Sequence, residues 1–176
     1  MPKSRCLLVV LGAFTALAAP AFAASARPPA ARSTSLKHAL LTSRELWATV
    51  DVCNPPDQRN WVGIRGSMPG DGHPHDRMYM SFRLQYLSSS TKQWVDAASA
   101  RSPFLAVGTG ASTRQDGTSF KLVRGTSPFT LRGVVDFQWR RGGTVLWSAL
   151  RLTTAGHHSI SGADPVGYSA ATCLIG

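Results

Sequence analysis

Apolar and polar residues alternate with a period of two along most of the chain beyond residue 45. The segment 77–87 is the clearest case, because every second position is apolar and would face one side of a sheet: Met78, Met80, Phe82, Leu84 and Tyr86. The same period occurs at 46–53, 61–67 and 129–139. Shorter segments of this kind lie around 92–95, 104–107 and 119–123, and a last strand is expected at 168–175.

The segment 144–154 differs from the others, because apolar residues occupy both of its faces. That pattern is typical of a central strand, which is covered on both sides. Turns rich in Gly and Ser separate the strands at hairpin spacing, and helical periodicity is almost absent. We therefore expect an all-β fold, a β-sandwich of about 7–9 antiparallel strands, over residues 44–176.

Residues 24–43 do not continue this pattern. The segment opens with Pro and Ala and carries only basic charge. Leu36, Ala39 and Leu40 could form a single helical turn, but no apolar periodicity sustains a longer helix. We interpret the segment as a flexible tether.

The first 23 residues have the three parts of a secretory signal. Lys3 and Arg5 form a basic start, residues 6–18 are uncharged and apolar, and Ala21-Phe22-Ala23 offers small residues to a signal peptidase. We expect cleavage after residue 23, with a second candidate site after residue 26. No later stretch is apolar for long enough to span a membrane. The expected location is therefore secreted or extracellular.

Composition adds a basic charge to this picture. The formal net charge of +10 falls to +8 when the signal is removed, since Lys3 and Arg5 leave with it. Signal cleavage also removes Cys6, so two cysteines remain, Cys53 and Cys173. An exported protein with two cysteines most simply forms one disulfide, and two buried thiols are the alternative.

The opening with Trp47 and Cys53, the segments LRGVVDFQW and RLTTAG, and the closing SAATC resemble immunoglobulin-like and fibronectin-type-III-like modules of secreted bacterial proteins. The resemblance covers about residues 44–176. It implies an immunoglobulin-like β-sandwich and no particular activity. The chain departs from antibody-type domains, in which the paired cysteines flank a Trp at shorter spacing.

A bond between Cys53 and Cys173 would place the ends of the first and last strands together. The loops 68–76 and 155–166 would then both start from the opposite end of the sandwich. These loops contain four of the five histidines, namely His73, His75, His157 and His158. Imidazole is a ligand for copper and zinc, so a metal-binding site is one hypothesis, with Asp76 as a further ligand. Exposed loop histidines without a metal, and therefore no cofactor, are the alternative.

Met78 and Met80 follow this loop and would suit Cu(I). They continue the apolar face of segment 77–87, however, so core packing explains them fully.

Catalytic motifs are absent from the sequence: no G-x-S-x-G elbow and no H-E-x-x-H occurs. His158, Ser159, Ser161 and Asp164 are close in sequence, which does not make a triad. We therefore expect that the protein is not an enzyme.

Arg residues near the end of the chain are a candidate binding surface. Arg140, Arg141 and Arg151 lie with Arg132 on one expected hairpin, together with Trp139 and Trp147. Arg beside aromatic rings can bind anions, although a solvated strand surface with the rings in the core is the alternative. Trp61 and Trp94 could be exposed loop aromatics or core residues.

Taken together, the sequence predicts a secreted, monomeric β-sandwich without catalysis. Its expected role is to bind an extracellular or cell-envelope partner, either a protein or an acidic or glycan polymer, and no nucleic acid is expected. The alternative is a copper- or zinc-binding protein that uses its loop histidines.

Overall fold

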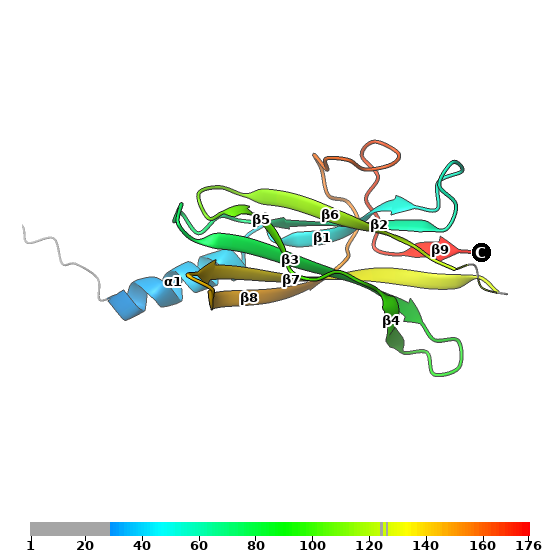
Figure 1. The fold of residues 1–176 in the computed structure, drawn as a ribbon, viewed down its shortest axis with the longest axis horizontal. Helices are drawn as coiled ribbons and strands as arrows, with labels where there is room; N and C mark the ends of the chain where they lie inside the picture. Colours follow the sequence, from blue (N-terminus) through cyan, green and yellow to red (C-terminus); the bar gives the residue numbers. More distant parts are fainter. Residues whose placement is uncertain (1–28, 124, 126) are drawn as a thin grey trace, which may run out of the picture.

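The fold is seen in a computed structural model that describes residues 29–176, except 124 and 126 (Figure 1). The expected signal peptide, residues 1–23, lies outside the described residues. The described part contains one helix and nine strands: α1 Pro29–Leu41, β1 Trp47–Cys53, β2 Trp61–Met68, β3 Arg77–Leu87, β4 Trp94–Arg101, β5 Leu105–Thr109, β6 Arg114–Lys121, β7 Phe129–Arg141, β8 Thr144–Leu152 and β9 Cys173–Ile175.

The strands form two antiparallel sheets that pack face to face. The smaller sheet has the order β1-β2-β6, and the larger has the order β4-β3-β7-β8, with β5 also paired to β3 and β9 also paired to β7. The prediction of an all-β sandwich is confirmed. The bounds of β3 match the segment 77–87, because its alternating residues define one buried face without ambiguity.

The core fills the space between the two sheets. Its largest fully buried side chains come from both of them, including Ile64 and Met68 of the smaller sheet and Phe82, Phe137 and Trp139 of the larger. Cys53 of β1 is bonded to Cys173 of β9, so the expected disulfide is present and joins the two sheets covalently.

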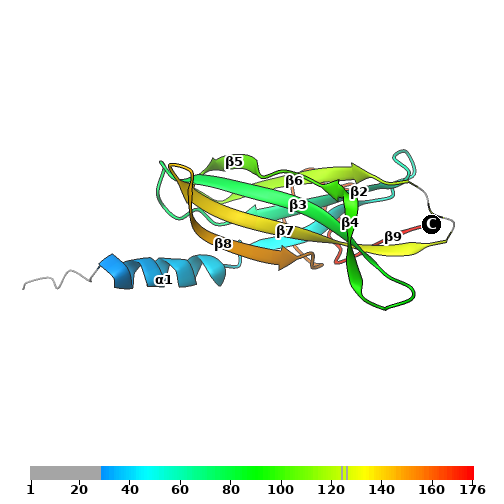
Figure 2. The ribbon, with the colours of Figure 1, turned by 60° about the horizontal axis from the view of Figure 1, so that its bottom comes forward.

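The segment expected to be a tether contains α1 instead. The helix is attached to the sandwich near its C-terminal end, through Leu40, which is buried, and Leu36 and Leu41, which are half-buried. Arg151 of β8 donates a hydrogen bond to the Leu41 carbonyl at 2.6 Å. Figure 2 shows the rest of α1 extending beyond the sandwich. Because only the C-terminal part of α1 packs on the core, the sequence of this segment has too little apolar periodicity to predict a helix of 13 residues.

The prediction that segment 144–154 is a central strand is wrong. β8 lies at the edge of the larger sheet and pairs only with β7 among the described strands. Its outer face is apolar yet partly open to solvent, with Leu150 46% and Leu152 40% exposed. Leu152 lies directly opposite Val134, which is buried on that face. The apolar outer residues of β8 therefore pack beside residues of β7, and not against another sheet or helix of the described chain.

The end of the chain also differs from the expected strand at 168–175. β9 spans only three residues, and the segment before it runs along the free edge of β1. Backbone hydrogen bonds join Thr154 to Ala48, and Ala170 to Val50 in both directions. The residues 155–167 therefore form an irregular loop beside β1 that covers its exposed backbone. Within the part of the chain that the structure describes, no helix is both long and apolar enough to cross a membrane.

Candidate metal centre

The loop between β2 and β3 folds back on itself through local hydrogen bonds. Asp71 Oδ1 accepts a hydrogen bond from the backbone N–H of His73 at 2.9 Å, an Asx turn. The N–H of Asp76 donates to the His73 carbonyl at 3.1 Å and closes a second turn. Gly72 has a φ of +82°, a conformation that favours glycine. The sequence GDGHPHD thus supplies the residue types that two consecutive turns require.

The loop is held in place from two sides. On one side, the N–H of Gly110, in the turn between β5 and β6, donates to the Asp76 carbonyl at 2.9 Å. A Cβ at Gly110 would lie 2.0 Å from Asp71 Oδ1, so only glycine permits this approach. On the other side, Nε1 of the buried Trp139 donates to the Pro69 carbonyl at 3.0 Å. These contacts bury the Asp71 side chain and fix its position.

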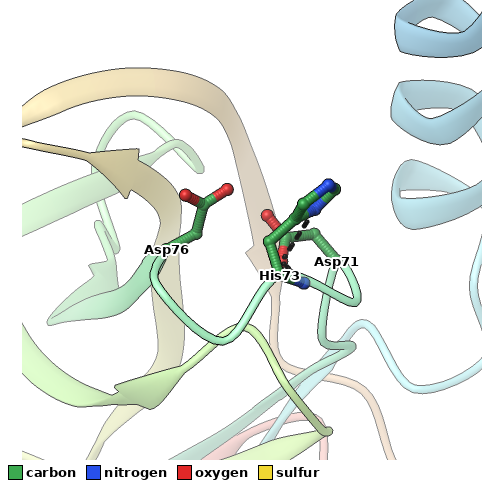
Figure 3. A group of neighbouring side chains, drawn as sticks. All are labelled: Asp71, His73 and Asp76. Carbon is green, nitrogen blue, oxygen red and sulfur yellow. Dashed lines mark hydrogen bonds and ion pairs between the residues drawn. The ribbon is translucent and has the colours of Figure 1, made fainter.

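Three side chains converge in this loop: Asp71, His73 and Asp76 (Figure 3). One carboxylate oxygen from each aspartate and one imidazole nitrogen lie within 4.8 Å of one another. Both carboxyl groups are buried, whereas the His73 side chain is 52% exposed. The group is therefore closed on the protein side by two fixed acids and open to solvent on the side of the imidazole.

Asp71 brings an unsatisfied buried atom to this group. Its Oδ2 accepts no hydrogen bond, although the residue is only 5% exposed. A buried polar atom without a partner is costly and calls for an explanation, such as an ion. Burial raises the pKa of Asp71, and the hydrogen bond from His73 N–H opposes this. The Asp76 carboxylate raises it further, through its charge and through a side-chain hydrogen bond that requires a proton on Asp71.

Asp76 is held in its ionised form. Arg141, at the end of β7, donates two hydrogen bonds to its carboxylate, from Nε to Oδ1 at 2.6 Å and from Nη2 to Oδ2 at 2.7 Å. The guanidinium keeps the pKa of Asp76 below its ordinary value, and burial opposes that effect only partly. Ligating carboxylates in metal sites are themselves hydrogen-bonded in this way, so Arg141 orients Asp76 without using both lone pairs of each oxygen.

The chemical type of these three donors limits which metal ions the group could bind. One imidazole and two carboxylates suit Zn²⁺ and Cu²⁺, and three protein ligands would leave a coordination position open to solvent. Met78 and Met80 are fully buried and face the core. Among the neighbouring side chains, the soft ligands that Cu(I) prefers therefore do not join the group.

The four predicted histidines are not gathered into one set. Among the described residues, Asp71, His73 and Asp76 are the only group of metal-binding size, and it includes neither of the histidines of the loop 155–167. His75 and His158 are exposed. His157 is stacked on Trp47 with ring centroids 4.4 Å apart, and its Nε2 lies 2.8 Å from Thr154 Oγ1.

The three predicted binding arginines also separate, although they lie on one hairpin. Arg140 covers the Tyr79 ring on the outer face of the larger sheet, Arg141 pairs with Asp76, and Arg151 bonds to the Leu41 carbonyl of α1. They are therefore not one surface. Trp139, which the sequence placed between them, is fully buried.

Sequence reasoning included Asp76 as a candidate ligand but missed Asp71. The signal available was the Gly-Asp-Gly triplet, in which an aspartate stands two residues before His73. What makes Asp71 a candidate ligand is its burial against Gly110, a contact between segments that are 39 residues apart. Spacing within the loop alone does not reveal that contact.

Comparison with known proteins leaves the family undefined. No protein-family model and no curated protein matches the chain. A solved structure of an alkylpurine DNA glycosylase from Pseudomonas fluorescens, bound to DNA containing an abasic site analogue, is similar at 15% identity and a TM-score of 0.31. The match covers 61% of this chain and 28% of that chain.

The expectation that the protein is not an enzyme is corrected by this comparison, since the similar structure is that of an enzyme. That expectation rested on the absence of familiar motifs and of a recognisable triad, and such signatures do not cover all catalytic sites. A TM-score of 0.31 carries no argument for catalysis in this chain, so no activity is assigned from it.

Proposed function

We propose that this protein is an exported β-sandwich that binds one divalent ion, Zn²⁺ or Cu²⁺, through Asp71, His73 and Asp76. The observation that carries the proposal is the buried, unsatisfied Oδ2 of Asp71 inside a group of donors that lie within 4.8 Å of one another. An ion there would satisfy this oxygen and neutralise the repulsion between the two carboxylates.

Arg141 supports this assignment through the charge balance. Two ionised carboxylates and one guanidinium give the group a net charge of −1 when His73 is neutral. Without an ion, this excess negative charge favours the protonated form of Asp71, in agreement with its raised pKa. A divalent ion would compensate this charge directly and would compete with a proton for Asp71.

Export is part of the proposal. The Cys53–Cys173 disulfide fits an oxidising compartment, in agreement with the signal expected over residues 1–23. The strand orders β1-β2-β6 and β4-β3-β7-β8 support an immunoglobulin-like assignment, since they correspond to A-B-E and C′-C-F-G of that fold class. β5 and β9 are additions to that pattern.

Isothermal titration calorimetry with ZnSO₄ and CuSO₄ tests the proposal on the oxidised protein. We expect one ion per chain, and a loss of affinity of about 10–100-fold or more in Asp71→Asn and in His73→Ala. His75→Ala and His158→Ala are matched controls, because both histidines are exposed and lie outside the group. His75 is in the same loop as the group, and His158 is in the loop 155–167. Both controls should keep the affinity of the wild type.

Two results would contradict the proposal. If Asp71→Asn binds the ion as tightly as the wild type, the buried oxygen is not a ligand. If His75→Ala and His158→Ala weaken binding as much as His73→Ala does, the exposed histidines bind the ion without a defined site. Far-UV circular dichroism of each variant separates either result from unfolding.

A further inference from the structure

The outer face of the larger sheet carries two copies of one arrangement, and neither copy includes a residue of the metal-binding group. In the first copy, the guanidinium of Arg132 lies over the Trp94 ring, 4.4 Å from its centroid, and Arg132 Nε donates to Gln85 Oε1 at 2.8 Å. In the second, Arg140 lies 4.2 Å from the centroid of the Tyr79 ring, and its Nε donates to Gln138 Oε1 at 2.8 Å.

Strand register places these residues on one surface. Gln85 lies opposite Arg132, and Tyr79 opposite Gln138, so each pair projects from the same face of the β3–β7 ladder. That face is turned away from the core, because the buried residues of β3 alternate with Tyr79 and Gln85. Arg132 and Arg140 are eight residues apart on β7, so their Cα atoms are separated by about 27 Å along the strand.

Neither arginine has an acidic partner. Among the described residues, no carboxylate forms an ion pair with Arg132, with Arg140 or with the exposed Arg77, which lies opposite Arg140 in the strand register. Arg83 and Arg101 of the same face are neutralised. Between the two stacks, Arg83 contacts both Asp96 and Asp136, and Arg101 contacts Asp96 at 2.9 Å. The face therefore has two fixed, uncompensated guanidinium groups near its ends, with the exposed Arg77 beside one of them, and a charge-balanced network between them.

The aromatic rings and glutamines prepare these guanidinium groups for an anion. Each ring holds the guanidinium plane in place and each glutamine accepts from the Nε–H, so the remaining N–H donors have a fixed orientation. Gln138 also accepts from Nη2 of Arg140. All four side chains of these stacks are half-buried, which reduces the entropy lost on binding. Phe104 adds a second ring 4.9 Å from the Arg140 guanidinium.

We infer that this face binds a linear acidic polysaccharide, with a carboxylate or sulfate group of the polymer at each of Arg132 and Arg140. Charge complementarity requires an anionic ligand, and the separation of the two arginines requires one that is extended. Guanidinium groups bind such oxyanions through paired hydrogen bonds. Single-stranded nucleic acid fits less well, because its bases stack on open aromatic faces and here guanidinium groups cover the ring faces.

Binding of polygalacturonate, measured by biolayer interferometry at rising NaCl concentration, tests this inference. We expect the double variant Arg132→Gln/Arg140→Gln to bind about tenfold more weakly or worse, and to depend less steeply on salt. The matched control is Arg44→Gln/Arg59→Gln, which removes two exposed positive charges outside the face. The control should bind as the wild type does, and neutral dextran should not bind.

Three results would overturn the inference. Equal losses in the double variant and in the control would mean that the net positive charge attracts the polymer diffusely. Binding of oligo-dT that exceeds that of polygalacturonate and depends on the same two arginines would assign the face to nucleic acid. Unchanged binding by the double variant, with a native circular dichroism spectrum, would exclude this face. None of these results depends on the metal-binding group.

Discussion

At the scale of single residues, the β2–β3 loop contains two buried carboxyl groups whose pKa values shift in opposite directions. The pKa of Asp71 is raised by burial, and that of Asp76 is lowered by the guanidinium of Arg141. Opposite shifts in neighbouring acids mark a site at which one acid retains a proton more readily than the other. In this loop, the acid with the raised pKa is also the one whose oxygen accepts no hydrogen bond.

This arrangement predicts the behaviour of Asp71→Asn without metal. Because the folded state raises the pKa of Asp71, its contribution to stability is lost as the pH rises from the unfolded value of about 3.9 through the folded pKa. Asparagine keeps the oxygen that accepts from His73 N–H and can donate to Asp76. We expect Asp71→Asn to be more stable than the metal-free wild type at pH 7 by about 1–2 kcal/mol.

Urea unfolding at pH 7 in the presence of a chelator measures this difference. Addition of ZnSO₄ should then stabilise the wild type and leave Asp71→Asn unchanged. A wild type that is more stable than the variant in chelator would mean that the Asp71 carboxylate already has a favourable partner within the protein.

His157 gives a second prediction at this scale. Burial, and then the nearby His158, lower its pKa below the ordinary value of about 6.5. The unfolded chain therefore binds a proton before the folded one, and stability should decrease as the pH falls below about 6.5, by at most about 1.4 kcal/mol per pH unit. The neutral ring stacks on Trp47, so protonation would weaken contacts of the loop beside β1.

The variant His157→Phe keeps an aromatic ring against Trp47 and removes the titration. Its unfolding midpoint in urea should depend less on pH between 5 and 7 than that of the wild type. His75→Phe, which changes an exposed histidine, should retain the wild-type dependence. If the wild type and His157→Phe follow the same curve, the stack does not respond to pH.

At the scale of the elements, close approach of the two sheets depends on small residues in the strands. A Cβ at Gly133 of β7 would lie 2.6 Å from Thr153 Cγ2 and 2.9 Å from the side chain of Ile64 in β2. Real Cβ atoms do not approach neighbours so closely, and both neighbouring side chains are buried, so neither can move aside freely. Glycine at this position therefore sets the distance between β7 and the smaller sheet.

We accordingly expect Gly133→Ala to lower the free energy of unfolding by about 1–3 kcal/mol through overpacking. Thermal unfolding followed by circular dichroism measures the change. Ser148→Ala, on the exposed face of β8, is the control and should change the stability by less than about 0.5 kcal/mol. An unfolding midpoint for Gly133→Ala equal to that of the wild type would show that β7 and β2 can separate without cost.

The elements also differ in how far the sequence predicts them. β3 and β7 follow from strict alternation, because a slip of one residue would turn their apolar faces to solvent. The edge position of β8 does not follow, since Leu150 and Leu152 give the same apolar pattern on an exposed face as on a covered one. α1 is missed because only its C-terminal part packs on the core. In the candidate site, Asp71 is buried by Gly110, a contact that depends on how two loops meet.

At the scale of the whole molecule, the disulfide joins the two sheets across a sequence separation of 120 residues. Cross-links between distant residues restrict the unfolded chain strongly, so we expect Cys53→Ala/Cys173→Ala to lose about 2–5 kcal/mol of stability. Guanidinium chloride unfolding of the double variant and of the oxidised wild type gives this difference. Equal midpoints would mean that packing alone holds β1 and β9 together.

The molecule as proposed has two independent surfaces on one sandwich. The metal-binding group lies in the β2–β3 loop at the end of the sheets, and the arginine stacks lie on the outer face of the larger sheet. Arg140 and Arg141 are adjacent in sequence and serve the two surfaces separately, since neighbouring residues of a strand project to opposite sides. The metal-binding claim is the central one, because it rests on a buried atom that lacks a partner.

The most direct test of that claim is native mass spectrometry of the protein exported by its own host and purified without chelators. The account predicts a chain that has lost two hydrogens at its cysteines and carries one zinc or copper ion. It also predicts that the ion is absent from Asp71→Asn and present in His75→Ala. An oxidised wild-type chain without metal, or Asp71→Asn with a full complement of the same ion, would contradict the account.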